Sequence, residues 1–397
     1  AARVILRENL PDYMVPTALM AMDQLPLTPA GKVDRKALPK PQAMVLAGGE
    51  YVAPRTDMES ALVEMWEALL PVEQVGVTDN FFDIGGHSLI GVRLMARVSQ
   101  EFAVSLQIVE LLNAPTIEQL CETIIRSGGN KEWTPLVTLR GVENASQKVP
   151  PIFFIHPVGG DVLCYTDLAA SLPSDMPVYG LQARGFIQGF EVFESFDDMV
   201  NCYVDAIKQH SPTGPYRIAA QSLGGVIALH VAEKLKAAGG EVQRIMMLDT
   251  FTPSAMVKEQ LSNVQVIESA IGQPLPKNVR HLAESGDDAW LETLYKTAKA
   301  ARMLPDDLTL EQIQAIYNVA ITNHRMVSQA DLNNVDRYSG FSIDHYAASD
   351  RVSGEGSQVD WKAKGYQFNY IDAVGDHESM IRGEQAVMLA KTIAGSL

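Results

Sequence analysis

The sequence has few cysteines, little basic charge and no long apolar run. Three cysteines (Cys121, Cys164 and Cys202) occur in 397 residues without a CxxC pair, which argues against a disulfide framework or a zinc site and fits a reducing cytoplasm. Lysine and arginine number 32 against 48 aspartates and glutamates, a formal net charge of -16, and this excludes a general nucleic-acid binder. No apolar run reaches the roughly eighteen residues that a membrane span needs.

The composition along the chain predicts three parts joined by two linkers. Residues 41–54 and 128–148 are rich in proline, glycine and polar residues and lack periodicity, which is typical of linkers. They separate a short segment (1–40), a small domain (55–127) and a large domain (149–397). The chain begins without methionine, inside a helical pattern and without a signal peptide. We therefore expect it to be a piece of a longer protein.

The small domain has the pattern of a helical bundle. Thr56 and Glu59 form a capping-box pattern ahead of apolar residues at helical spacing. A second helix is expected from Ser88, and a third follows Thr116 and Gln119, which repeat the capping-box pattern. Three to four amphipathic helices in so short a span predict a compact all-α domain.

The large domain alternates strands and helices. The candidate strands are short apolar runs, as buried parallel strands are: Ile152–Ile155, Val178–Leu181, Tyr216–Ala219, Ile245–Leu248 and Phe368–Val374. Helical patterns between several of them predict a mostly parallel sheet that is covered on both faces. From Pro253 to about Gln329 the pattern is almost entirely helical. This segment is expected to be an insertion that acts as a lid above the strand ends.

A serine lies at the turn after the third expected strand. In the run YRIAAQSLGG, Ser222 stands two residues from Ala220 and two from Gly224. A nucleophile at such an elbow needs small residues at these positions because neighbouring backbones approach closely. Ala220 occupies a position that is usually glycine. The motif alone also fits a serine that only caps the following helix.

Two residues at other strand ends complete a hydrolytic set. Asp249 directly follows the fourth expected strand, and His377 lies just past the last one. The order Ser, Asp, His is the chain order of α/β-hydrolases. In these roles Ser222 attacks, His377 takes its proton and Asp249 orients the imidazole. Asp350, near the end of another possible strand, is an alternative acid.

The turn after the first strand offers donors for an oxyanion. It reads HPVGG from His156 to Gly160. The backbone N–H groups of Val158 and Leu223 would hold the oxyanion of a tetrahedral intermediate. Taken alone, the turn also fits a glycine-rich loop without a role. Together with the serine, aspartate and histidine it predicts a serine enzyme that transfers acyl groups.

A second serine carries a different signal. In the run DNFFDIGGHSL, Ser88 opens a helix after two glycines, where a phosphate would meet free N–H groups and the positive end of the dipole. A simple N-cap is the alternative. The run resembles the phosphopantetheine attachment motif of peptidyl carrier proteins, which are bundles of amphipathic helices. The resemblance implies that a phosphopantetheinyl transferase attaches 4'-phosphopantetheine to Ser88, and that the thiol of this arm holds an acyl chain.

The flanking segments carry further resemblances. LPDYMVP and PLTPAGKVDR, within residues 10–35, resemble the end of an adenylation domain of a nonribosomal peptide synthetase, with Ala30 where asparagine is usual. The resemblance implies that Lys32 matches the lysine that contacts substrate during adenylation. It would be inactive here because the nucleotide pocket is absent. The large domain resembles a type I thioesterase.

Along the chain, a remnant of an adenylation domain is followed by a carrier domain and then by a hydrolase domain. This is the domain order of a terminal synthetase module. The resemblance implies upstream condensation and adenylation domains as partners, a peptidyl thioester as substrate, and a role in making an antibiotic or siderophore. The peptidyl group would pass from the arm on Ser88 to Ser222 and leave by hydrolysis or macrocyclisation. Two alternatives stay open: an editing thioesterase that clears mis-primed carriers, and a non-catalytic hydrolase fold that serves as a docking platform.

Overall fold

The chain forms two compact units, residues 1–132 and residues 133–397. The computed structural model describes residue 26; residues 51–127 apart from 71, 73, 87, 103, 105, 107–109, 112 and 113; and residues 133–141, 149–185, 191–258, 262–264, 266, 280, 290–300, 309–350 apart from 333, and 357–397. The segment 1–40, with Lys32, therefore lies outside the described residues apart from residue 26.

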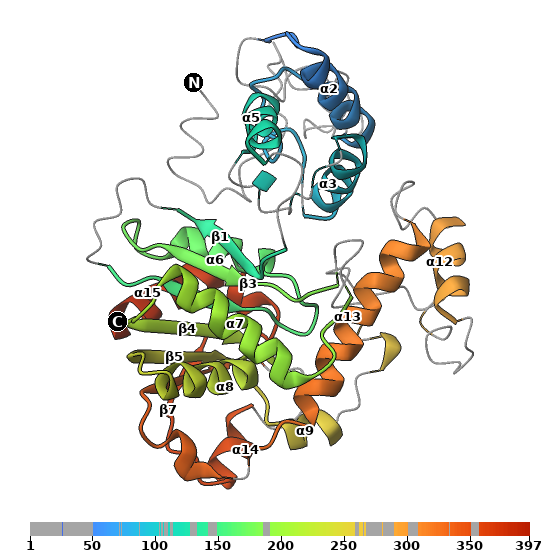
Figure 1. The fold of residues 1–397 in the computed structure, drawn as a ribbon. Coiled ribbons are helices and arrows are strands. Elements are labelled where there is room, and N and C mark those ends of the chain that lie inside the picture. The colour runs from blue at the N-terminus through green and yellow to red at the C-terminus, as the bar shows by residue number, and fades with distance from the viewer. Residues whose placement is uncertain are drawn as a thin grey trace. The chain divides into compact units, whose positions relative to one another are not determined.

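The first unit contains the three expected helices, α2 (Asp57–Leu69), α3 (Ser88–Phe102) and α5 (Ile117–Ser127) (Figure 1). Thr56 caps α2, since its hydroxyl accepts from the N–H of Glu59 at 3.1 Å. The carboxylate of Glu59 does not close the capping box onto Thr56. It accepts instead from the backbone N–H of Arg55 at 2.6 Å, and the guanidinium of Arg55 also reaches Glu118 at the start of α5. Arg55 thus ties the first helix to the last.

The second unit is built on a sheet of seven strands among the described residues. They are β1 (Leu136–Arg140), β2 (Ile152–Ile155), β3 (Val178–Leu181), β4 (Tyr216–Gln221), β5 (Val242–Leu248), β6 (Ile343–Ala348) and β7 (Asn369–Ala373), in the spatial order β1-β3-β2-β4-β5-β6-β7. β1 is antiparallel to β3, and every other pair is parallel. The expected mostly parallel sheet is confirmed.

β1 falls inside residues 128–148, which were expected to form a linker. It pairs with β3, with Leu136 opposite Leu181. Only one of its five side chains, that of Val137, is buried. The guanidinium of Arg140 donates to the carbonyls of Leu172 and Met176 at 2.9 and 2.8 Å. This edge strand is held by backbone pairing and by an arginine, so it has no apolar alternation that the sequence would reveal.

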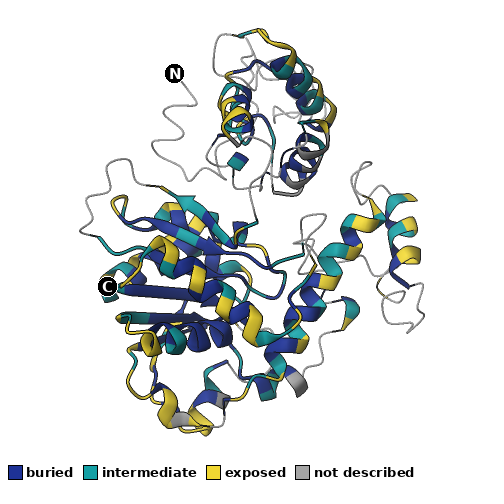
Figure 2. Cartoon of the chain, in the orientation of Figure 1, coloured by how far each residue is buried: buried dark blue, intermediate teal, exposed yellow. Residues whose placement is uncertain are grey.

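Helices cover both faces of the sheet (Figure 1). α7 (Phe196–His210) and α8 (Gly224–Ala237) pack on one face, and α6 (Thr166–Ser171) and α15 (Gly383–Ser396) pack on the other. All six residues of β4 are buried, and Figure 2 shows the central strands as a buried layer between the helices. A central strand covered on both faces is apolar almost throughout, which explains why its position was readable from sequence.

The described part of the insertion is helical, as predicted. It comprises α9 (Pro253–Lys258), α12 (Trp290–Ala300) and α13 (Leu310–Ser328). α13 begins at a complete capping box between Thr309 and Gln312. A short helix, α14 (Gln358–Ala363), follows β6. Within the described ranges, no helix is long and apolar enough to cross a membrane.

Candidate active site

Ser222 and Asp249 occupy strained turns at the ends of adjacent strands. Ser222 follows β4 with a φ of 57°, and Asp249 follows β5 with a φ of 45°. They are the two non-glycine residues with positive φ in the described part of the chain. Their backbones are held by hydrogen bonds to the next strand, from Ser222 N to Leu248 O at 2.9 Å and from Asp249 N to Tyr346 O at 2.7 Å. Strain of this kind persists where the surrounding structure enforces it, and it gathers at functional sites.

The elbow requires glycine two residues after Ser222. A Cβ on Gly224 would lie 2.5 Å from the carbonyl oxygen of His156 and 3.0 Å from that of Ile155. It would also lie 3.2 Å from the Cβ of Ala220. Because Gly224 leaves that space open, alanine is accommodated at position 220. This is the physical reason why the departure from the usual glycine is tolerated.

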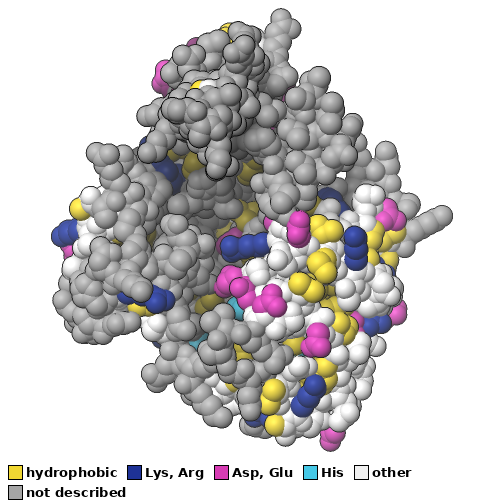
Figure 3. All heavy atoms as spheres, turned by 180° about the vertical axis from the view of Figure 1, so that it is seen from behind, with side chains coloured by type: hydrophobic (Ala, Val, Ile, Leu, Met, Phe, Trp, Pro, Cys, Tyr) yellow, Lys and Arg dark blue, Asp and Glu magenta, His cyan; other side chains and the backbone are white. Residues whose placement is uncertain are grey.

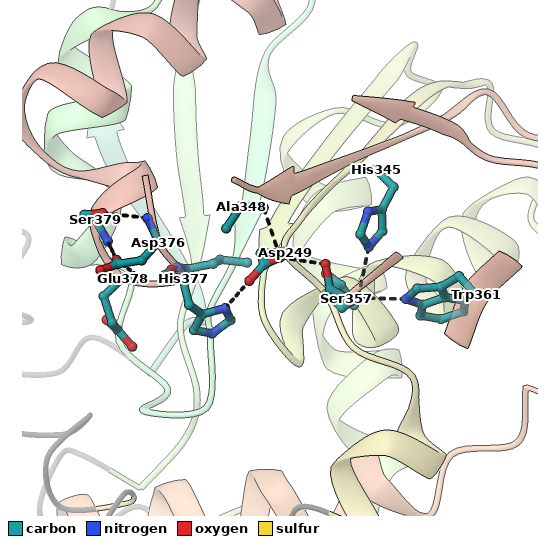
Figure 4. Close-up of polar contacts among 11 residues, drawn as sticks. Asp249, His345, Ala348, Ser357, Trp361, Asp376, His377, Glu378 and Ser379 are labelled. Atoms are coloured by element: carbon teal, nitrogen blue, oxygen red, sulfur yellow. Dashed lines mark hydrogen bonds and ion pairs between the residues drawn. The ribbon is translucent and has the colours of Figure 1, made fainter. Parts of the chain in front are cut away.

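The side chains of Asp249 and His377 are brought together (Figure 4). Asp249 Oδ2 lies 2.7 Å from His377 Nδ1, and Oδ1 accepts from the N–H of Ala348 at 3.1 Å and from the hydroxyl of Ser357 at 2.6 Å. Asp249 is buried, whereas the side chain of His377 is 34% exposed. A carboxylate accepts only, so Nδ1 carries the proton and Nε2 remains free to act as a base.

The contact between Asp249 and His377 shifts the pKa of each side chain. Burial raises the pKa of Asp249, but the hydrogen bond and charge of His377 and the donors Ser357 and Ala348 outweigh it, so the pKa of Asp249 is lowered. Burial lowers the pKa of His377, but the hydrogen bond and charge of Asp249, with Glu378 and Asp376, raise it above its ordinary value. Each group stabilises the charged form of the other.

His377 is anchored next to the elbow by its own backbone. The side-chain amide of Gln221, the residue before Ser222, donates to the carbonyl oxygen of His377. The following turn is closed by Asp376, whose carboxylate accepts from the N–H of Ser379 at 2.7 Å (Figure 4). The hydroxyl of Ser222 makes no hydrogen bond with His377 among the described residues. Such contacts are often long before substrate binds.

The turn Pro157–Gly160, called the oxyanion turn below, closes with a hydrogen bond from Gly160 N to Pro157 O at 3.0 Å. Ala183 N donates to Gly160 O at 2.8 Å and ties the turn to the segment after β3. In the described part of the structure, the N–H groups of Val158 and Leu223 have no hydrogen-bond partner. Both therefore remain available as donors.

Asp350, the alternative acid, takes no part in this arrangement. It is exposed, its N–H donates to Gly375 O at 3.0 Å, and its carboxylate accepts from the hydroxyl of Ser349 at 3.3 Å. The residue that is hydrogen-bonded to His377 is Asp249.

Ser88 lies at the first position of α3, directly behind a tightly packed turn. A Cβ on Gly86 would lie 2.3 Å from the ring of Phe81, and Gly85 has a φ of 106°. The buried ring of Phe81 packs edge-to-face on Trp66 at 5.2 Å. The first turn of α3 contains no acidic residue, and the first N–H groups of a helix lack intrahelical partners. This setting fits a phosphate ester on Ser88.

Sequence reasoning missed three polar residues that support the site. Ser357 donates to Asp249, Gln221 donates to the backbone of His377, and Asn323 donates to Val158 O at 3.1 Å. Gln221 directly precedes Ser222, so its position in the sequence could have indicated a place near the site. Nothing in the local pattern around Ser357 or Asn323 indicates a partner more than a hundred residues away.

The described part of the face in Figure 3 carries a mixed charge, with single lysines and arginines among acidic side chains. Within the described ranges, no group of three His, Cys, Asp or Glu side chains is placed to hold a metal ion. The site brings together a serine at a strained turn, an imidazole–carboxylate pair and two backbone N–H groups.

Two family models match the chain. A thioesterase domain model covers residues 150–393, and a phosphopantetheine attachment site model covers residues 60–124. The thioesterase match lies within the sheet unit, and the attachment-site match lies within the helical unit.

The chain is similar to parts of much longer proteins. It is 41% identical over 244 residues to a dimodular nonribosomal peptide synthase of Bacillus subtilis (62% of this chain, 10% of that protein). It is 31% identical over 405 aligned positions to the chondramide synthase of Chondromyces crocatus (96% of this chain, 10% of that protein). Among solved structures, a holo four-domain nonribosomal peptide synthetase bound to AMP and glycine matches with a TM-score of 0.59 and 28% identity, over 99% of this chain and 30% of that one.

Proposed function

This chain belongs to the thioesterase family and joins its thioesterase domain to a phosphopantetheine carrier domain, and from that premise we propose that it is the product-releasing end of a nonribosomal peptide synthetase. The observation that carries the proposal is the Asp249–His377 pair at the elbow of Ser222, in one chain with a carrier domain. We assign Ser222, Asp249 and His377 as the catalytic residues and Ser88 as the attachment site.

In the first half of the reaction, Ser222 Oγ attacks the thioester carbonyl while His377 Nε2 takes its proton. Ser88 would hold 4'-phosphopantetheine, which would supply the thiol that carries the acyl group. The N–H groups of Val158 and Leu223 hold the oxyanion. His377 then gives its proton to the departing thiolate, and Asp249 stabilises the imidazolium meanwhile.

In the second half, His377 Nε2 activates a nucleophile that attacks the ester on Ser222. A water gives hydrolysis, and a hydroxyl or amine of the acyl chain gives macrocyclisation. The proton returns to Ser222 Oγ as the ester bond breaks. Both outcomes use the same residues, so the catalytic set fits either one.

The proposed partners follow from the two domains. A phosphopantetheinyl transferase modifies Ser88, and upstream condensation and adenylation domains of a longer synthetase deliver the peptidyl chain. We assign Lys32, in the adenylation-like segment, no part in the release reaction. Cys121, Cys164 and Cys202 are free thiols, which fits our placement of the reaction in the reducing cytoplasm.

Labelling by a fluorophosphonate tests whether the site is catalytic. An activated serine attacks phosphorus, so Ser222 is expected to be labelled stoichiometrically, as judged by intact mass and peptide mapping. The Ser222→Ala variant is the control. A folded chain that stays unlabelled would support a docking platform instead. A panel of acyl groups loaded on the carrier separates release from editing, because clearing a mis-primed carrier would remove a group that is not the peptidyl chain, whereas product release would remove the peptidyl chain.

The rate of this labelling should report the pKa of His377. Only the neutral imidazole accepts the serine proton, so the rate rises with pH. Because Asp249 raises the pKa of His377, the midpoint is expected above the ordinary value of 6.5. Asp249→Asn removes that carboxylate, so it should move the midpoint to lower pH and reduce the plateau rate by about 10⁴-fold. An unchanged midpoint in the variant would contradict the assignment of Asp249.

A further inference from the structure

The oxyanion turn is held at both peptide planes that flank Val158. The first plane contains the carbonyl of Pro157 and the N–H of Val158, and the second contains the carbonyl of Val158. A trans peptide is planar, with its C=O and N–H pointing in opposite directions, so fixing the carbonyl also fixes the N–H of the same plane. The N–H of Val158 lies in the first plane, and the second plane, which carries the N–H of Gly159, adjoins the first at the Cα of Val158. Holding Pro157 O therefore orients the Val158 N–H directly, and holding Val158 O restrains it through the φ and ψ angles of Val158.

His156 holds the first plane from inside the core. Its Nδ1 lies 2.7 Å from Pro157 O, and its Nε2 lies 2.7 Å from the hydroxyl of Tyr203. A carbonyl only accepts, so Nδ1 donates and Nε2 accepts from the tyrosine. His156 is fully buried, and burial lowers its pKa to about 4. The ring therefore stays neutral and keeps this arrangement at neutral pH.

Asn323 of α13 holds the second plane from the helical insertion. Its Nδ2 donates to Val158 O at 3.1 Å, and the side chain is 2% exposed. The other hydrogen bonds of the turn, those of Gly160 and Ala183, come from the turn itself and from the segment after β3. A buried carbonyl that loses its donor is costly, since water cannot replace it. The turn thus depends on the insertion through this amide.

α13 is one continuous helix that joins the insertion to the core. Met326 and Val327, near its C-terminus, belong to the core of the second unit. Nearer its N-terminus, Tyr317 packs edge-to-face on Trp290 of α12 with the ring centroids 5.1 Å apart. Figure 1 shows α13 reaching from α12 toward α9. Its 19 residues span about 28 Å at 1.5 Å per residue. Asn323 lies on this helix three residues before Met326, close to the end that packs into the core.

We propose that Asn323 is a positioning residue that makes the oxyanion turn depend on the seating of α13. The inference rests on the proposed function, because it takes Val158 N–H as an oxyanion donor. With α13 seated, Asn323 fixes the plane after Val158 while His156 fixes the plane before it, and the donor is in place. Without the Asn323 amide, Val158 O loses its partner, and the plane that carries Val158 N–H is restrained from the His156 side alone.

The test compares Asn323→Leu, which removes the amide at similar size, with Thr322→Val at the adjacent buried position. The substrates are p-nitrophenyl butyrate and the butyryl thioester of N-acetylcysteamine, with the full 397-residue chain. Complete loss of an oxyanion donor costs about 10²–10³ in kcat, so misalignment is expected to cost about 10–100-fold, with KM within about 2-fold. Butylboronic acid, which forms a tetrahedral adduct with the serine, should bind more weakly in proportion to kcat/KM.

The outcomes separate positioning from packing. If Asn323→Leu lowers only the melting temperature, or raises KM with kcat and boronate affinity unchanged, the proposal is overturned. If Asn323→Leu does not fold, Asn323→Asp has the same shape and turns an acceptor toward Val158 O, and the same loss of kcat is expected. Failure of the proposed function is distinct: fluorophosphonate would then leave Ser222 of the unmutated chain unlabelled, and the inference would fall with it.

Discussion

The Ser222→Ala variant is expected to keep its acyl group on the carrier while the unmutated chain releases it. The carrier is loaded with a panel of acyl-coenzyme A thioesters and a broad-specificity phosphopantetheinyl transferase, and acyl loss is followed by intact-protein mass. Without the nucleophile, attack by water remains as the route, so release should slow by about 10⁴–10⁶-fold. We expect the mass of the acyl-loaded variant to stay constant, whereas the acyl-loaded form of the unmutated chain disappears with time.

A serine outside the site provides the matched control for this loss. Ser195 caps α7, where its hydroxyl accepts from the N–H of Asp198 at 3.1 Å. Ser195→Ala should cost about 1 kcal/mol of stability through the lost cap and leave release unchanged. Equal release by the Ser222→Ala variant and the unmutated chain would contradict the covalent mechanism on Ser222, even though the fold is that of a thioesterase domain.

The parts of the fold that the sequence predicted are those with a strong local pattern. β2, β3 and β4 are buried almost throughout, as are the last four residues of β5, and their apolar runs predict buried strands directly. β1 at the edge has one buried side chain in five, so its segment resembles a linker. β1 becomes a strand by pairing with β3, and this pairing joins residues far apart in the sequence, since Leu136 lies opposite a residue 45 positions further along.

The predicted site residues share one placement rule. Ser222, Asp249 and His377 each follow a strand of a parallel sheet, and the carboxyl ends of such strands meet at one edge. This rule places a pair of residues 128 positions apart within reach of one another. Ser357 and Asn323 follow no strand. Ser357 precedes α14, and Asn323 lies in the C-terminal half of a long helix, so their contacts depend on how those helices pack.

The Ser88→Ala variant is expected to gain no mass with coenzyme A and a broad-specificity phosphopantetheinyl transferase, whereas the unmutated chain gains one phosphopantetheine. Transfer forms one phosphodiester to the serine oxygen, and alanine has none to offer, so the effect is all or none. Ser60→Ala is the control, because Ser60 lies on α2 of the same unit and its hydroxyl only donates to Thr56 O at 3.0 Å.

This second experiment bears on a different half of the chain from the first. Ser88 begins α3 two residues after Gly86, whose lack of a Cβ lets the turn close on Phe81. The packing that positions the start of the helix does not involve this substitution, so Ser88→Ala should leave it intact. A mass gain that persists in Ser88→Ala would move the attachment to another residue. No gain in the folded, unmutated chain would remove the carrier from the proposal and leave Ser222, if fluorophosphonate labels it, as the nucleophile of a hydrolase that takes its acyl group from elsewhere.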